Sequence, residues 1–135
     1  MNWKRLLFAV GVAFVAAVVV DLIVNAILLR DVFEQTARFW RPPEELNRLV
    51  PLGLGSLLAT MACFALLFAR LGGQGVRRGL EFGFWLSMAS TAGVVGMISL
   101  VPWPMPLIAS MAAQQAANNL LLGFCLGWLY RPSAS

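Results

Sequence analysis

Four long apolar stretches limit the possible folds of this chain more than any other feature. They cover residues 6–29, 49–69, 80–101 and 107–130. Each has at least the roughly 20 residues that cross about 30 Å of hydrocarbon as an α-helix. Runs such as residues 12–20 lack the alternation of apolar and polar residues that is typical of barrel strands. The stretches predict an all-α fold, an integral membrane four-helix bundle in which residues 1–135 form a single transmembrane domain.

The composition supports the same class of protein. Hydrophobic residues make up 60% of the chain and charged residues 12%, about half the charged fraction that is usual in soluble proteins. Ten Lys and Arg against six Asp and Glu give a net charge of +4. There is no His, and the two Cys are far apart, so the usual metal ligands and catalytic groups are scarce. We expect a lipid bilayer as partner, and neither a metal, a cofactor nor nucleic acid.

The distribution of basic residues predicts the orientation. Lys4 and Arg5 precede the first stretch as in a signal peptide, but the stretch is long and has no convincing small-x-small cleavage site, so we expect it to be retained. The inner side then carries six basic residues: Lys4, Arg5, Arg70, Arg77, Arg78 and Arg131. The outer side carries four: Arg30, Arg38, Arg41 and Arg48. This positive-inside bias predicts that both termini are cytoplasmic.

The connection between the first two spans, residues 30–48, is long enough for a short interfacial helix. Asp31 with Glu34 resembles an amino-terminal cap, and Pro42-Pro43 must end the segment. An apolar stripe is available from Val32, Phe33, Phe39 and Trp40. The segment is either a solvated, interfacial connector or a lid or partner-docking element.

Two further pairs of residues are expected at the lipid headgroups. Trp40 and Trp103 fall at the outer ends of predicted spans, where indole rings favour the membrane interface. Arg77 and Arg78 lie in a Gly-rich turn, residues 71–79, which we expect to contact anionic headgroups at the inner face.

Asp21 is the only acidic residue deep in a predicted span. Ala13, Ala17, Asp21 and Asn25 follow one another at intervals of one helical turn and therefore share one face of the helix. Two small and two polar residues on this face suggest that it contacts protein rather than lipid. The fourth span carries four amides that should not face lipid: Gln114, Gln115, Asn118 and Asn119. Asp21 and Gln115 are each about 12 Å below the same surface. We predict a polar cluster of Asp21, Asn25 and the four amides.

Three interpretations of this cluster compete: interhelical hydrogen bonding, a polar cavity for an ion, proton or small polar solute, and self-association. Asp21 has no second carboxylate or His beside it, so we do not expect an enzyme. The favoured function is a non-catalytic accessory or structural bundle that contacts another membrane protein or a second copy as a homodimer. The alternative is a small homo-oligomeric transporter or channel that uses Asp21.

Small residues recur every fourth position in three of the predicted spans. They form the rows Gly55, Ala59 and Cys63; Gly83, Ser87 and Thr91; and Gln115, Asn119, Gly123 and Gly127. This spacing predicts close helix contact.

Three short motifs resemble a family of small four-helix bacterial inner-membrane proteins to which no activity is assigned. They are Asp21-x-x-x-Asn25, Phe39-Trp40-Arg41-Pro42 with Glu45, and Leu129-Tyr130-Arg131-Pro132. Members often carry His where this chain has Asn25, so the resemblance implies no metal or pH-sensing role at that position. It implies a compact bundle in a bacterial cytoplasmic (inner) membrane.

Overall fold

The computed structural model describes residues 2–130, apart from the side chain of Leu28, and helices make up 88% of it, with no strand in this part of the chain. Arg131 and Pro132 lie outside the described residues. The elements are α1 (Trp3–Ile23), the π-helix η1 (Val24–Leu28), α2 (Arg30–Gln35), the 3₁₀-helix η2 (Ala37–Phe39), α3 (Pro43–Arg70), α4 (Gly75–Gly96), the 3₁₀-helix η3 (Met97–Ser99) and α5 (Met105–Leu129). The prediction of an all-helical chain is confirmed.

The four long helices begin before the apolar stretches that predicted them, because capping residues and prolines set their first turns. The Asn2 side chain accepts a hydrogen bond from the backbone N–H of Arg5 (3.2 Å) and caps α1. Pro42 and Pro43 start α3, where the preset φ of proline suits a first turn. The predicted loop 71–79 is shorter than expected, because α4 already begins at Gly75, which has a positive φ of 81°.

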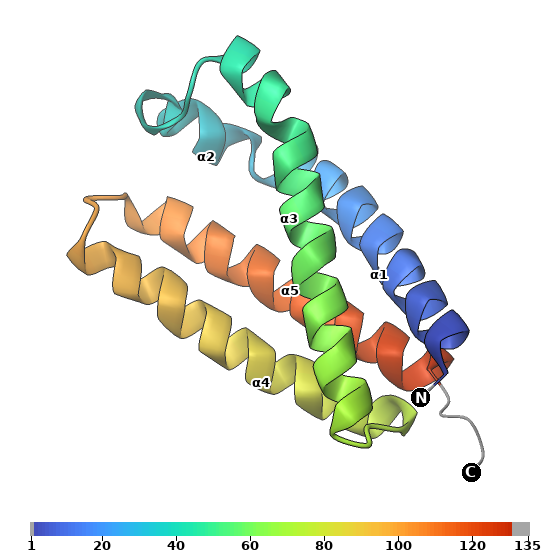
Figure 1. Cartoon of the computed structure of the whole chain (residues 1–135). Coiled ribbons are helices and arrows are strands. Elements are labelled where there is room, and N and C mark those ends of the chain that lie inside the picture. The colour runs from blue at the N-terminus through green and yellow to red at the C-terminus, as the bar shows by residue number, and fades with distance from the viewer. Residues whose placement is uncertain (1, 131–135) are drawn as a thin grey trace.

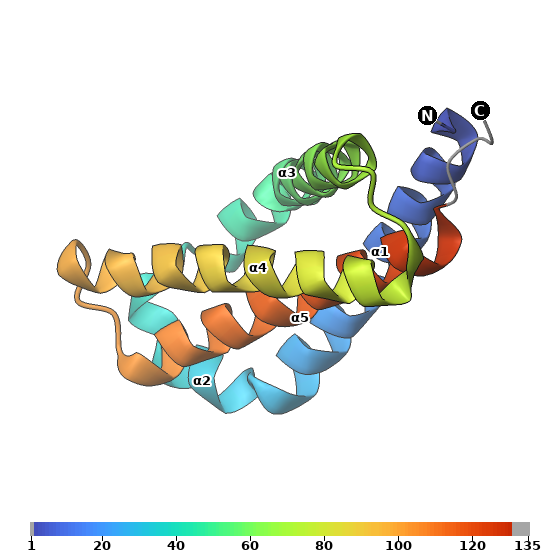
Figure 2. The ribbon, with the colours of Figure 1, turned by 90° about the horizontal axis from the view of Figure 1, so that it is seen from below.

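The helices are arranged around α5 (Figures 1 and 2). α4 lies antiparallel along one side of α5, and α1 packs against α5 with its small-residue face. α3 crosses this layer obliquely and contacts it mainly through its second half, where Met61, Ala65 and Phe68 are buried. Residues 43–56 of α3 are exposed throughout. The closed four-helix bundle is therefore not confirmed: three helices form a layer and the fourth leans across it.

Three helical segments are long and apolar enough to cross a membrane: Trp3–Ile27, Pro43–Arg70 and Gly75–Ser99. The fourth predicted span, in α5, has 25 residues and therefore the required length, but it is not among them. Its four amides, residues 114, 115, 118 and 119, lower the hydropathy of every window that contains them.

α4 and α5 approach each other along two rows of small residues. A Cβ added at Gly79 would collide with the backbone carbonyl oxygen of Gly123, and one added at Gly83 would lie 2.6 Å from the carbonyl oxygen of Asn119. Ser87 donates hydrogen bonds to the carbonyl oxygens of Gly83 (2.7 Å) and, across the interface, Ala116 (3.2 Å). The predicted contact of small residues is thus confirmed for these two helices.

The same prediction is wrong for the second span within this chain. Gly55, Ala59 and Cys63 are exposed, and a Cβ added at Gly55 would meet nothing within 4 Å. The larger side chains of Met61 and Phe68 fill the contact that α3 makes with its neighbours, so α3 approaches through a different face.

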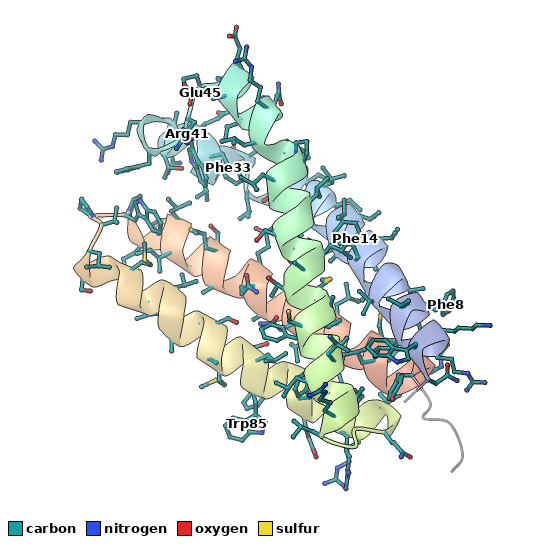
Figure 3. The ribbon with its side chains drawn as sticks, in the orientation of Figure 1. Phe8, Phe14, Phe33, Arg41, Glu45 and Trp85 are labelled. Atoms are coloured by element: carbon teal, nitrogen blue, oxygen red, sulfur yellow. The ribbon has the colours of Figure 1, made fainter. Side chains whose placement is uncertain are left out.

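The connector contains the short helix that the sequence predicts, α2, followed by η2. Glu34 does not cap it; its carboxylate forms an exposed ion pair with Arg30 (3.0 Å). A second exposed pair, Arg41 with Glu45 (3.2 Å), lies at the start of α3 (Figure 3). The Trp40 indole packs against Phe33, with ring centroids 5.0 Å apart, at the point where the chain continues into α3.

Candidate functional site

Asp21 lies near the end of α1 and faces α5. Both of its carboxylate oxygens accept hydrogen bonds from the Nδ2 amide of Asn118, at 3.1 and 3.2 Å. Ala17 and Ala13, one and two turns earlier on the same row, are fully buried, and their small size lets α1 approach α5 closely enough for this contact. The partner is Asn118 rather than Gln115, the residue that the sequence places level with Asp21. Asn118 lies three residues, or about 4.5 Å, further along α5.

An open groove with a volume of about 460 Å³ lies beside this pair. Its polar wall contains Asp21, Gln114, Gln115 and Asn118, and its apolar wall consists of Val50, Gly53, Leu54 and Leu57 of α3 with Met111 of α5. The oblique crossing of α3 leaves this space, because α3 approaches α5 only where the two helices cross and then diverges from it (Figure 1). The groove brings together four of the six residues predicted to form the polar cluster.

The other two members of the predicted cluster lie outside the groove lining. Asn119 is 3% exposed and donates a hydrogen bond to the Ser90 hydroxyl of α4 (3.1 Å). Asn118 and Asn119 are adjacent in sequence and therefore about 100° apart around the helix, so one faces α1 and the other faces α4. Asn25 lies in the π-helix η1 and its Oδ1 atom is buried without a hydrogen-bond donor.

Asn118 also holds a buried atom without a partner. The residue is 7% exposed, and while its Nδ2 donates to Asp21, its Oδ1 has no hydrogen-bond donor. A buried acceptor left unpaired costs roughly 1–3 kcal/mol, so such atoms in native proteins call for an explanation. Here the atom belongs to a residue that lines an open groove.

No basic side chain neutralises Asp21 within the described residues. The ion pairs of residues 2–130 join Arg30 to Glu34, Arg41 to Glu45 and Arg77 to Glu81, all of them exposed. Over the same residues, no group of three or more His, Cys, Asp and Glu could hold a metal ion. The site therefore offers one carboxylate and several amide groups as hydrogen-bonding partners.

The predicted headgroup residues lie at opposite ends of the chain's long helices. Trp40 and Trp103 line one small cavity together with Leu107, so the structure brings these two indoles together. Arg77 and Arg78 are on the first two turns of α4, where Arg77 pairs with Glu81 (3.1 Å) and remains largely exposed.

The apolar wall of the groove and the role of Ser90 were not predicted from the sequence. Val50, Gly53 and Leu54 sit within a uniformly apolar span, and nothing in such a span marks which face turns toward Asp21. Ser90 was detectable in principle, because it lies three residues beyond Ser87, on the adjoining part of the same helix face.

In comparisons with protein families, curated proteins and solved structures, nothing matches the chain. The resemblance to small bacterial inner-membrane proteins therefore stays a prediction.

Proposed function

We propose that the chain is a small multi-pass protein of a bacterial cytoplasmic membrane, with four spans. Three membrane-length helices support insertion, as do large apolar side chains on the outer surface, including Phe8 and Trp85, which are 62% and 68% exposed (Figure 3). α5 is the least apolar span, yet Asn118 and Asn119 are buried against neighbouring helices and need not face lipid.

We further propose that both termini lie on the cytoplasmic side. The start of α1 and the end of α5 are at the same end of the molecule (Figure 1), and the count of basic residues favours that end as the inner one. In a Cys63→Ala, Cys125→Ala background, a membrane-impermeant maleimide added to intact cells should label Pro102→Cys and spare Gln74→Cys. The reverse pattern would show that the orientation is inverted.

The groove supports a function in binding a small polar solute or an ion, without catalysis. The observation that carries this proposal is Asp21: an acidic side chain at an open groove, held by Asn118 and without a basic partner in residues 2–130. Ionisable groups within spans commonly mark the path of a solute or proton. Four helices enclose little volume, so a transporter or channel of this kind would work as a homodimer or larger oligomer.

Native mass spectrometry of the protein released from its own membrane tests this proposal. A small molecule or ion retained by the wild type and lost from correctly folded Asp21→Asn is the expected result. A groove that is empty in both proteins, together with unchanged transport in cells that carry Asp21→Asn, contradicts it.

A second candidate function is that of an accessory protein that binds another membrane protein. The first half of α3, residues 43–56, favours it, because every residue of this segment is exposed over about four turns. A partner that co-purifies in stoichiometric amount and is lost on substitution of Leu52, 70% exposed, by Arg would support this role. Purification of the wild type without any partner would speak against it.

A further inference from the structure

The groove beside Asp21 has two chemically different walls. One is polar and carries Asp21 with the amides of residues 114, 115 and 118. The wall contributed by α3 is apolar, and Met111 adds an apolar side chain on α5 beside the amides. A ligand that fits both walls must itself have a polar end and an apolar part.

The carboxylate of Asp21 has unused acceptor capacity. Among the described residues it accepts side-chain hydrogen bonds from Asn118 alone, whose Nδ2 group contacts both carboxylate oxygens. A carboxylate accepts about four hydrogen bonds, so positions remain on Asp21. A ligand group that donates several hydrogen bonds would use them.

The carboxylate of Asp21 indicates that the ligand group should be positively charged. Asp21 has no Lys or Arg partner within residues 2–130, and a carboxylate in apolar surroundings is stabilised by an opposite charge. A protonated primary amine offers a positive charge and three N–H donors in one compact group. It remains protonated at neutral pH, as the amine of lysine does.

The size of the groove separates an organic cation from a bare ion. Its volume of about 460 Å³ is many times the roughly 30 Å³ that one water molecule occupies in the liquid. A monovalent metal ion would occupy a small part of this space and leave the wall of Leu54 and Leu57 without contact. A short hydrocarbon chain would cover that wall and remove its apolar surface from water.

We propose that the groove binds a protonated primary amine that carries a short hydrocarbon chain. Its ammonium group donates to the carboxylate of Asp21, and its chain lies along Leu54, Leu57 and Met111. This inference rests on the proposed function of the groove as a binding site and names the class of ligand.

Isothermal titration calorimetry of the full chain in detergent tests the chemical class with three probes. n-Hexylammonium has both features, n-hexanol lacks the charge, and tetramethylammonium has the charge but neither N–H donors nor a chain. We expect binding of n-hexylammonium and at least tenfold weaker binding of the other two, in line with the strength of charge-assisted hydrogen bonds. Equal binding of hexylammonium and hexanol would overturn the proposal, because partition into the micelle would then explain both.

Two matched pairs of variants locate the binding. Asp21→Asn removes the charge with little change of shape, and Asp31→Asn makes the same change at an exposed position in α2. Hexylammonium should bind at least tenfold more weakly to Asp21→Asn and with unchanged affinity to Asp31→Asn. The opposite order, or equal affinity for both, would refute the assignment to Asp21.

The second pair does not depend on how Asp21 affects folding. Gly53 lines the groove, Gly55 does not, and a Cβ at either position would meet nothing within 4 Å. Gly53→Phe should fill the groove and abolish binding of hexylammonium, whereas Gly55→Phe should leave it unchanged. Both replacements remove a glycine from the same helix, so their effects on helix propensity match. Binding that survives Gly53→Phe would place the ligand elsewhere.

A final titration separates failure of this inference from failure of the proposed function. If sodium ions or a neutral solute such as glycerol bind, are lost from Gly53→Phe, and hexylammonium does not bind, then the groove is a binding site and the amine is the wrong ligand. If none of these probes binds in a manner that depends on Gly53 or Asp21, both proposals fail.

Discussion

The contact between α4 and α5 makes a quantitative prediction about Gly79. The two helices are so close here that a Cβ on Gly79 would overlap the carbonyl oxygen of Gly123 and lie 2.9 Å from both the Cα and the nitrogen of Gly127. All three atoms belong to the backbone of α5, so no side-chain rotation relieves the overlap. Gly79→Ala must therefore push the two helices apart.

Two opposing terms set the size of the effect. Replacing glycine by alanine inside a helix favours folding by up to about 1 kcal/mol, because the unfolded chain loses conformational freedom. Overpacking a tight contact costs about 1–3 kcal/mol, and a rigid backbone neighbour puts Gly79 near the upper end of this range. The net loss of unfolding free energy is then about 2 kcal/mol, or about a thirtyfold change in the folding equilibrium.

Gly93 supplies the control within the same helix. A Cβ added there would meet nothing within 4 Å, so Gly93→Ala retains the gain in helix propensity and adds no overlap. Both variants and the wild type are unfolded in mixed micelles by titration with a denaturing detergent, and circular dichroism follows the loss of helix. We expect the free energy of unfolding to fall for Gly79→Ala and to rise for Gly93→Ala. The reasoning is refuted if Gly79→Ala is as stable as Gly93→Ala, because the α4–α5 contact would then be looser than the structure has it.

The same unfolding assay checks two further predictions. Asn118→Leu removes the hydrogen-bond donor from both oxygens of Asp21 and should lower the free energy of unfolding by about 1–3 kcal/mol. This loss should be smaller in a protein that already carries Asp21→Asn. If the effects of the two substitutions simply add, the two side chains are not in direct contact. Trp40→Phe keeps an aromatic ring near Phe33 but loses the hydrogen bond from the indole nitrogen to the Thr36 hydroxyl (3.0 Å). The free energy of unfolding should therefore fall by about 1 kcal/mol. An unchanged value would indicate that this connector does not contribute to stability.

The sequence predicts individual helices better than their arrangement. Apolar length identified each long helix, and the spacing of Gly83, Ser87, Asn119 and Gly123 predicted a close contact for α4 and for α5 without naming their partners, because small residues at every fourth position leave room for a backbone. The same spacing in α3 led to a wrong prediction. Around Gly55 no partner within residues 2–130 fills the space that small residues leave, so spacing shows where a close approach is sterically possible and not whether a helix makes it.

The candidate site was predictable to the level of its polar wall. The sequence places an acid on one helix and amides on another, and hydrogen bonding requires that they meet inside the protein. It does not determine which amide faces which helix, because a shift of one residue turns a side chain by about 100°. It also does not predict the groove, since the groove arises from the angle at which α3 crosses α5, and that angle depends on the fit of side chains such as Met61 and Phe68.

The polar character of α5 follows from its central position. A helix that packs against α4 on one face and α1 on another can hold amides on both, since each neighbour supplies partners: Ser90 for Asn119 and Asp21 for Asn118. A peripheral helix would expose such amides to lipid at a cost of several kcal/mol each. The amides that lower the hydropathy of α5 thus agree with its being the helix most enclosed by protein. Of the hydrogen-bonding atoms on these two asparagines, the Oδ1 of Asn118 alone is left buried and unpaired, and it belongs to the residue that holds Asp21 at the groove.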